Sequence, residues 1–152
     1  MHTPVLMATT SRRIEWVDTD AAGHQHNSAI MRCAEACEAQ LFRELALPDY
    51  FGRSPRVRHE VNFRAKLYFG QEVTTELRLE RLGERSMTFS FQMWGEAFEG
   101  RPRRLSADGR FVTVCVPPGS EQSAPWPEHI RERVRNRALG VRNTPDQEQR
   151  NR

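Results

Sequence analysis

A change in hydrophobic period, from helical to strand-like, constrains the fold of this chain more than any other feature of its sequence. Between residues 27 and 45, apolar residues recur at spacings of three and four, which is typical of a helix with one buried face. Asn27 and Ser28 are both good N-cap residues, and Pro48 stops the helix after its end. The apolar stripe consists of Ile30, Ala34, Cys37, Leu41 and Leu45.

From residue 57 onward, apolar and polar residues alternate, as they do in strands with one buried face. Short turns join four such stretches, so consecutive strands are expected to be antiparallel. The stretches are 57–64, 73–80, 87–94 and 103–116. A shorter strand from Arg12 to Val17, with Ile14 and Trp16 on one face, is expected before the helix. Because only one long helix is available to cover the sheet, the pattern predicts an α+β fold in which an antiparallel sheet of about five strands curls around one central helix.

The length of 152 residues fits one domain. We expect a disordered lead over residues 1–11, a folded domain over 12–135 and a polar, disordered tail over 136–152. No apolar run is long enough for a signal peptide or a membrane span. The three cysteines form no disulfide framework. These features predict a cytoplasmic protein without a membrane partner, in which the cysteines are reduced, small apolar residues.

The formal net charge is +3, and much of the excess comes from arginines in the last third of the chain. Such a balance suits a phosphorylated or acidic partner, and it equally suits a solvated surface. No nucleic-acid partner is expected.

Three titratable residues, Asp18, Asp20 and His24, lie within seven positions between the first strand and the helix. A helix N-terminus presents unpaired N–H groups and a partial positive charge, which stabilise a developing oxyanion. A carboxylate just upstream can face the same point as a nucleophile or as a general base toward water. The pair would serve acyl transfer. The spacing alone also fits a structural role, because Asp residues commonly shape turns.

The stretch Trp-Val-Asp-Thr-Asp-Ala-Ala-Gly-His-Gln-His-Asn, from Trp16 to Asn27, resembles the signature of the 4-hydroxybenzoyl-CoA thioesterase family of hotdog-fold proteins. The similarity continues at 35–38 and 42–45 in the helix and at 61–73 in the strand and turn beyond it. The resemblance implies a hotdog fold, in agreement with the order of elements predicted above. It also implies hydrolysis of an acyl thioester of coenzyme A or of an acyl carrier protein, with no metal or redox cofactor.

On this resemblance, Asp20 is the catalytic carboxylate and the backbone N–H of Asn27 points at the thioester carbonyl. Whether Asp20 attacks the carbonyl or activates water stays open. His24 is expected to orient the substrate near the carbonyl, and Asp18 to fix the loop.

Further residues are candidates for substrate contacts. Gly23 and His26 belong to the same motif, and Ser86 matches a position where the family often has a small hydroxyl residue near the site. Arg64 and Lys66 are candidates for the phosphates of the pantetheine arm, because Arg and Lys bind such groups.

Two features qualify the resemblance. Gln71 stands where the family usually has an acid, which leaves open whether the turn keeps the hydrogen bond of that acid but does not affect the chemistry. Related hotdog proteins use a Glu on the central helix, for which Glu35 and Glu38 are the candidates. With Asp20 present, we expect both glutamates on the helix surface.

Two other functions are kept as alternatives. Acyl-thioester hydratases or dehydratases of other hotdog families use an Asp–His pair, whose spacing Asp20 and His24 do not match well. A non-catalytic acyl-CoA-binding module of the regulatory type needs a DNA-binding segment, and only a dozen residues precede the first predicted strand.

We expect a homodimer or a homotetramer, because the predicted sheet has an exposed edge and one more apolar face than a single helix covers. The resemblance implies sheets joined edge to edge, with sites at the interface. The acyl pocket would be lined by helix residues and by the loop 46–56, where Leu47, Tyr50 and Phe51 suit an aliphatic or an aromatic acyl group.

Overall fold

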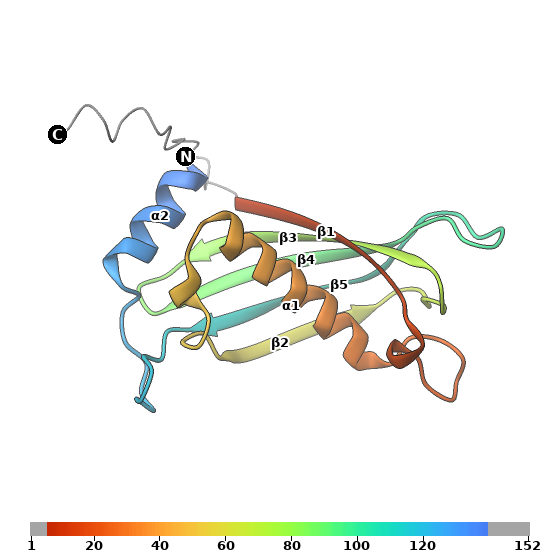
Figure 1. Cartoon of the computed structure of the whole chain (residues 1–152), viewed down its shortest axis with the longest axis horizontal. Coiled ribbons are helices and arrows are strands. Elements are labelled where there is room, and N and C mark those ends of the chain that lie inside the picture. The colour runs from red at the N-terminus through yellow and green to blue at the C-terminus, as the bar shows by residue number, and fades with distance from the viewer. Residues whose placement is uncertain (1–5, 140–152) are drawn as a thin grey trace.

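One curved antiparallel sheet wraps around the long helix α1 (Asn27–Glu44) in this computed structural model, which describes residues 6–139 (Figure 1). The strands lie in the order β1-β3-β4-β5-β2, and every neighbouring pair is antiparallel. Their bounds are β1 (Leu6–Arg13), β2 (Arg56–Phe63), β3 (Glu72–Leu82), β4 (Ser86–Gly95) and β5 (Arg104–Val114). The predicted architecture of five antiparallel strands around one helix is confirmed.

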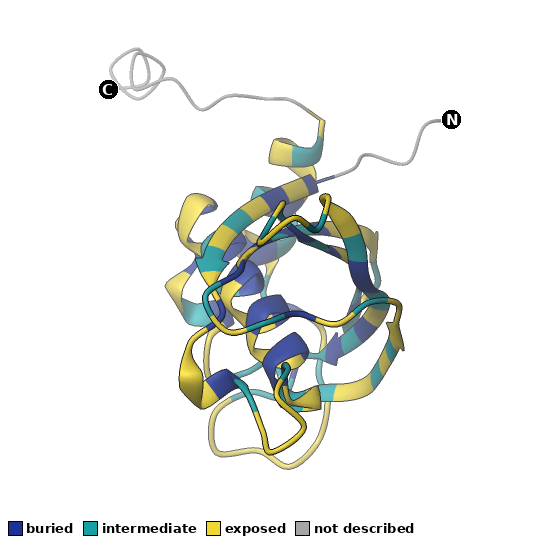
Figure 2. Ribbon diagram, turned by 90° about the vertical axis from the view of Figure 1, so that its right-hand side faces the viewer, coloured by how far each residue is buried: buried dark blue, intermediate teal, exposed yellow. Residues whose placement is uncertain are grey.

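The apolar stripe of α1 faces the concave side of the sheet. Ile30 and Leu41 are almost completely buried, as are the alternating apolar residues of the strands, such as Leu77 on β3 and Phe89 on β4. Figure 2 shows buried residues alternating with exposed or partly exposed ones along the strands. The two periods in the sequence therefore describe two surfaces that pack against each other.

The N-cap of α1 lies one residue before the first of the two N-cap residues predicted from the sequence. The N-cap is His26, whose Nδ1 accepts a hydrogen bond from the Ser28 N–H at 3.1 Å. Asn27 and Ser28, the predicted caps, are the first two helical residues. A histidine can replace the usual Ser, Thr, Asp or Asn because its unprotonated ring nitrogen is an acceptor.

The first strand begins earlier than predicted. Strand β1 starts at Leu6 and ends at Arg13, so residues 6–11 of the expected disordered lead pair with β3. Residues 1–5 of that lead lie outside the described part of the chain. Ile14 is buried as expected, but Trp16 belongs to the short 3-10 turn η1 (Trp16–Asp18) and is 83% exposed. The sequence Leu-Met-Ala-Thr-Thr-Ser-Arg-Arg has little apolar alternation, because β1 is an edge strand whose second half is only partly buried.

A second helix, α2 (Glu128–Ala138), covers one end of the core and was not predicted. It buries Ile130 and Val134 and follows the buried Trp126, while Arg133 and Arg137 donate hydrogen bonds to Leu45 O and Glu44 O at the end of α1. These bonds satisfy carbonyl groups that a helix C-terminus leaves unpaired. Residues 136–138 of the expected tail are thus helical, and residues 140–152 lie outside the described part of the chain.

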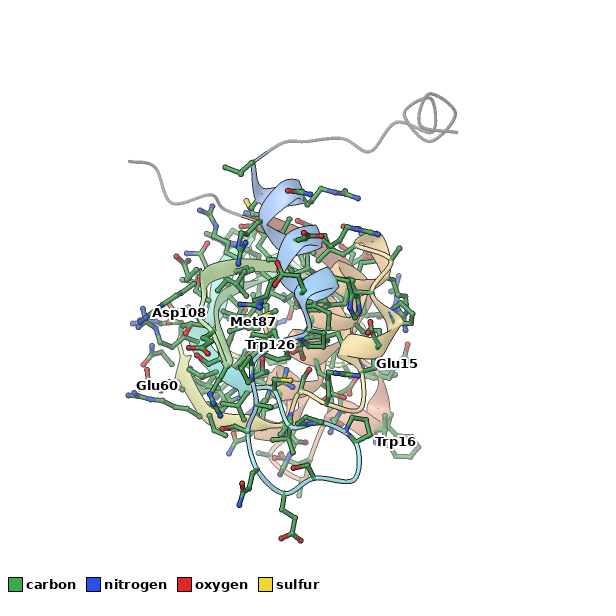
Figure 3. All side chains as sticks on the ribbon, turned by 90° about the vertical axis from the view of Figure 1, so that its left-hand side faces the viewer. Glu15, Trp16, Glu60, Met87, Asp108 and Trp126 are labelled. Carbon is green, nitrogen blue, oxygen red and sulfur yellow. The ribbon has the colours of Figure 1, made fainter. Side chains whose placement is uncertain are left out.

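The outer face of the sheet is polar, contrary to the expectation of a second apolar face. Phe89 and Phe91 both point inward and are buried. Trp94 lies on the outer face, where the guanidinium of Arg103 covers its ring at 4.4 Å. Glu60 and Asp108 also lie on the outer side (Figure 3). The alternation along β4 therefore places Trp94 on the face opposite Phe89 and Phe91, as predicted, but this outer face is otherwise polar.

The three cysteines are free and buried, as predicted for small apolar residues. Burial raises the pKa of all three thiols, Cys33, Cys37 and Cys115, so they are poor nucleophiles at neutral pH. Neither α1 nor α2 is long and apolar enough to cross a membrane, and these are the α-helices of residues 6–139.

The packing of α1 predicts a large difference between two neighbouring helix positions. Leu41→Ala should lower the free energy of unfolding by about 2–5 kcal/mol, because Leu41 is 1% exposed and its truncation leaves a cavity against the sheet. Gln40→Ala, at a partly exposed position, should change it by less than about 0.5 kcal/mol. Urea denaturation of both variants measures the difference, and equal losses would contradict the packing described.

Candidate active site

The loop of residues 19–26, between η1 and α1, carries most of the predicted site residues. Its two ends are joined, because His26 N–H donates to Asp18 O at 2.7 Å and Thr19 pairs with Gln25. Gln25 also attaches the loop to the segment after β2: its N–H donates to Leu67 O at 2.9 Å, and its Oε1 accepts from Leu67 N–H at 2.7 Å. The loop is therefore closed at its base and held to the rest of the sheet.

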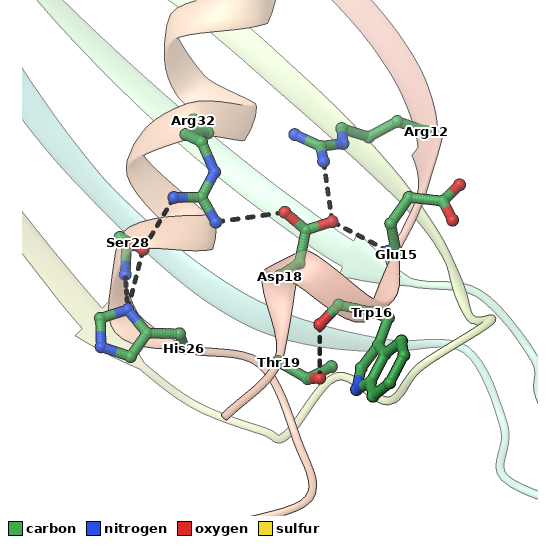
Figure 4. A network of polar contacts seen from close by, with 8 residues as sticks. All are labelled: Arg12, Glu15, Trp16, Asp18, Thr19, His26, Ser28 and Arg32. Carbon is green, nitrogen blue, oxygen red and sulfur yellow. Dashed lines mark hydrogen bonds and ion pairs between the residues drawn. The ribbon is translucent and has the colours of Figure 1, made fainter. Parts of the chain in front are cut away.

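Asp18 is the anchor of this loop. Its carboxylate is 1% exposed and accepts hydrogen bonds from the guanidinium groups of Arg12 at 2.8 Å and Arg32 at 3.2 Å (Figure 4). It also accepts from the Glu15 N–H at 2.9 Å. Burial alone would raise the pKa of Asp18, but the Glu15 N–H and the two arginines together hold it below its ordinary value. Asp18 thus fixes the loop, as predicted.

The same network reaches the helix cap. Arg32 donates both to Asp18 and, at 2.8 Å, to Ser28 Oγ, which in turn lies 2.8 Å from His26 Nδ1 (Figure 4). Because His26 Nδ1 accepts from the Ser28 N–H, a neutral His26 ring carries its proton on Nε2. His26, predicted to contact substrate, is exposed at the start of α1 with that Nε2–H directed away from the cap bond.

Asp20 lies in the exposed part of the loop. One carboxylate oxygen accepts from the Ala22 N–H at 2.8 Å, and Asp20 O accepts from the Gly23 N–H at 3.0 Å. Gly23 has a φ of +86°, which a glycine adopts without strain, so its role here is to turn the chain. Asp20 therefore does shape a turn. Its second carboxylate oxygen accepts no hydrogen bond from any group in residues 6–139.

The loop brings Asp20 and the N-terminus of α1 into one short, closed segment. No group within the described residues accepts a hydrogen bond from the Asn27 N–H, which is the first of the helix. His24 makes one long contact, from Nδ1 to Gln25 O at 3.3 Å, and is partly buried. One short closed segment thus carries a carboxylate oxygen without a donor, an amide without an acceptor and a helix N-terminus, which are the groups that acyl transfer uses.

The remaining predicted residues lie at different distances from this loop. Lys66 is exposed and directly precedes Leu67, which binds Gln25, so it lies beside the loop. Arg64 is two residues farther away and is paired with Asp108 at 3.2 Å.

Ser86 is not near the loop within one chain. It begins β4 beyond the far end of β3, whereas the loop adjoins the start of β3. The eleven residues of β3 separate the two by roughly 35 Å.

Residues 14–134 match the family described as the thioesterase-like superfamily. The chain belongs to this superfamily. Its predicted hotdog fold, its resemblance to 4-hydroxybenzoyl-CoA thioesterases and its assignment as a thioester hydrolase are confirmed.

Individual relatives and solved structures are similar to this chain over most of its length. The chain is 27% identical over 126 residues to a 1,4-dihydroxy-2-naphthoyl-CoA hydrolase of Trichodesmium erythraeum. The matched residues cover 79% of this chain and 89% of the relative. A predicted thioesterase from Bacillus stearothermophilus superposes with a TM-score of 0.73 at 29% identity, over 86% of this chain and 95% of that one. A Thermus thermophilus thioesterase solved with coenzyme A and zinc superposes with a TM-score of 0.73 at 25% identity, over 88% and 94% of the two chains.

Gln71 stands where the family usually has an acid, and its side chain still makes hydrogen bonds in the turn. The Gln71 side chain is 2% exposed, and its Oε1 accepts from the Tyr68 N–H at 3.1 Å. Its Nε2 donates to Glu96 O at 2.9 Å. The turn hydrogen bond, which the sequence left open, is therefore kept, because an amide oxygen accepts as a carboxylate does.

Glu38 is buried, although we expected it to lie on the surface of the helix. It is 5% exposed and binds Tyr50 and Arg56, whereas the Glu35 side chain is 73% exposed as expected. The position of Glu38 in the helical period, four residues after Ala34, was the available signal for burial. Within residues 6–139, no group of three or more His, Cys, Asp or Glu side chains is arranged to hold a metal ion.

Neutralising the two acids of the loop should change the free energy of unfolding by different amounts. Asp18→Asn should lower the free energy of unfolding at pH 7 by about 1–3 kcal/mol, because it weakens charged hydrogen bonds in a buried site. Asp20→Asn, at an exposed position, should change it by less than about 0.5 kcal/mol. Chemical denaturation of the two variants measures the difference.

The pH dependence follows from the direction of the Asp18 shift. A carboxyl whose pKa is lower in the folded than in the unfolded state stabilises the fold above its ordinary pKa of 3.8, and this stabilisation is lost as the pH falls through the folded value. Wild-type stability should therefore fall more steeply than that of Asp18→Asn between about pH 5 and pH 2. Parallel curves would contradict the anchoring role.

Proposed function

We propose that this protein hydrolyses an acyl-CoA thioester to a free acid and coenzyme A, with Asp20 as the reacting carboxylate. The observation that carries the proposal is the contrast between the two acids of one loop. Asp18 has both oxygens occupied by Arg12, Arg32 and a backbone amide, whereas Asp20 is exposed and keeps one oxygen free beside the start of α1. Only Asp20 is available to a substrate.

The N-terminus of α1 is suited to polarise the thioester carbonyl. The Asn27 N–H has no acceptor in the described structure, and the 18-residue helix adds a partial positive charge at this end. An amide so placed stabilises the oxygen of a tetrahedral intermediate. Asp20 then either attacks the carbonyl carbon, which gives an anhydride that water cleaves, or removes a proton from the attacking water.

Coenzyme A is the thiol that the comparisons favour. The Trichodesmium relative is named as a hydrolase of an acyl-CoA, and the Thermus structure contains coenzyme A. Lys66, exposed beside the loop, is the better candidate for a phosphate, since Arg64 is already paired with Asp108. An acyl carrier protein with the same pantetheine arm is the alternative donor. No observation favours a hydratase, because no hydrogen bond within residues 6–139 joins the His24 ring to the Asp20 carboxylate.

A homodimer formed through the free edge of β2 would complete the site. Strand β2 is an edge strand and carries Val57 and Phe63, which are 61% and 51% exposed. A symmetric antiparallel pairing of two β2 strands covers both edges and places the Arg56 end of one strand beside the Phe63 end of the other. The chain after Phe63 leads within four residues to Leu67, which holds the Asp20 loop.

The thioesterase assignment and the role of Asp20 are tested in one assay. The purified protein should release thiol from aliphatic or aromatic acyl-CoAs, as measured with a thiol reagent. Asp20→Asn should lower kcat/KM by about 10²–10⁴, because the variant loses the nucleophile or the general base. Glu15→Gln, which neutralises an exposed acid close to the same loop, should retain the wild-type value.

The assay can refute the proposed function and the proposed role of Asp20 separately. Absence of thiol release from every acyl-CoA and carrier-protein thioester would refute the function. Full activity of Asp20→Asn would refute the mechanism and leave the function in place.

A further inference from the structure

A closed ring of hydrogen bonds joins the buried anchor Asp18 to the first residues of α1 (Figure 4). The Asp18 carboxylate accepts from Arg32 at 3.2 Å, and Arg32 also donates to Ser28 Oγ at 2.8 Å. Ser28 Oγ in turn lies 2.8 Å from Nδ1 of the His26 ring. The ring closes through the backbone, because the His26 N–H donates to Asp18 O at 2.7 Å. One buried residue therefore holds both the side chain and the main chain of the N-cap.

The donors of this ring converge on a single nitrogen, Nδ1 of His26. The Ser28 N–H donates to it at 3.1 Å. Ser28 Oγ accepts from Arg32, which leaves its own hydrogen to donate to the same nitrogen. Both contacts require a lone pair on Nδ1, so the cap is made only by a neutral ring with its proton on Nε2.

The orientation of the Asn27 N–H depends on this cap, because that N–H belongs to the peptide unit that follows His26. A peptide unit is planar, so the Asn27 N–H and the His26 C=O turn together. The Ala29 N–H holds the C=O end of the unit at 2.9 Å, and the cap bond holds His26 at φ −72° and ψ 149°. The amide proposed to bind the thioester carbonyl is thus oriented by the side chain one residue upstream.

A proton on Nδ1 of His26 would disrupt this arrangement. It turns the acceptor of the cap into a donor that faces two other donors. The new charge would also lie at the positive end of the α1 dipole and beside the Ser28–Arg32 contact, where the guanidinium repels it. The cap bond would be lost, and with it one of the two bonds that orient the Asn27 amide.

The charges around His26 do not compensate for such a proton. The titratable and charged groups of the surrounding elements are Arg12 on β1, Glu15 and Asp18 at η1, Asp20 and His24 in the loop, Arg32 on α1 and Lys66 after β2. The Asp18 carboxylate is already shared by two guanidinium groups, and no other carboxylate within residues 6–139 forms an ion pair with the His26 ring. A protonated ring would therefore add an unpaired positive charge to the start of the helix.

We infer that His26 is a positioning residue for the hydrolysis: its neutral ring orients the Asn27 N–H, and protonation of the ring at acid pH switches the reaction off. This inference rests on the proposed acyl-CoA hydrolysis and adds control by pH to it. The role acts through the Asn27 amide and is separate from the substrate contact expected from the sequence.

The pH dependence of kcat/KM tests the inference. His26→Asn supplies an N-cap oxygen that accepts from the Ser28 N–H and does not titrate. At pH 8 it should hydrolyse acyl-CoA at least about threefold faster than His26→Ala, which has no cap acceptor. On acidification, the wild type should lose activity where histidines take up protons. The acid midpoint of His26→Asn should lie at least about one pH unit lower, where carboxyl groups do so.

Two other histidines provide matched controls. His129 is an exposed histidine on α2 that pairs with Asp49 beyond the C-terminal end of α1. His129→Asn should keep both the wild-type activity at pH 8 and the wild-type midpoint. His24→Asn should keep the midpoint, because the His24 ring contacts Gln25 O rather than the helix cap.

Nuclear magnetic resonance of the wild-type protein tests the cap without a substrate. At high pH the ring nitrogen shifts of His26 should show an unprotonated Nδ1 and a protonated Nε2. When the pH is lowered, the amide resonances of Asn27 and Ser28 should move with the same midpoint as the His26 ring. If His26→Asn does not fold, this titration alone decides the matter.

Three results would overturn the inference: an acid midpoint that His26→Asn leaves unchanged, a neutral His26 ring with its proton on Nδ1, or an Asn27 amide that does not follow the titration of that ring. The last two are measured without hydrolysis. They are therefore distinct from a failure of the proposed function, in which no acyl-CoA releases thiol.

Discussion

The burial of one face of α1 against the concave sheet is the interaction on which the rest of the structure depends. It places the N-terminus of the helix at one end of the sheet, beside the closed loop that carries Asp20. It also places Glu38, two-thirds of the way along the helix, beside the free edge strand β2. One packed element therefore fixes both the Asn27 amide and Glu38, about 16 Å apart along the helix axis.

Two acids separated by one residue have different physical roles because their surroundings differ. Asp18 is buried, and its charge is stabilised by two guanidinium groups and an amide, which leaves no oxygen for a substrate. Asp20 is exposed and uses one oxygen for a turn, which leaves the other free. The rigid anchor and the available carboxylate thus belong to one short motif, and the first fixes the loop that carries the second.

Much of the fold was predictable because its periods are strong, as Leu77, Phe89 and Leu41 illustrate by their burial. The limits of β1 were not, since an edge strand with few apolar residues resembles a polar lead. Helix α2 was missed for a similar reason: apart from Ile130 and Val134 it is almost entirely charged or polar, and it is stabilised by contacts with the distant end of α1.

The candidate site was predictable only in part. The position of Asp20 before a helix suggested chemistry, but the resemblance of the surrounding motif was needed to favour it over a turn. The helical period offered a signal for the burial of Glu38, but its partners Tyr50 and Arg56 could not be anticipated, because they come from the following loop and strand. The same is true of Gln25, whose clamp on Leu67 joins residues 42 positions apart. Such pairings arise from tertiary contacts that no local pattern records.

The central claim is that Asp20 of one chain acts on an acyl thioester in a site that the second chain completes, and heterodimers test it directly. Asp20→Asn lacks the carboxylate, and Ala39→Trp should fill the pocket that lies between α1 and the start of β2; each homodimer should be inactive. When the two chains are co-expressed with different tags and purified in tandem, one of the two sites in the heterodimer combines an intact Asp20 with an intact pocket. The expected activity is about half that of the wild-type dimer. A heterodimer as inactive as its parents, or the failure to isolate one, would contradict the claim.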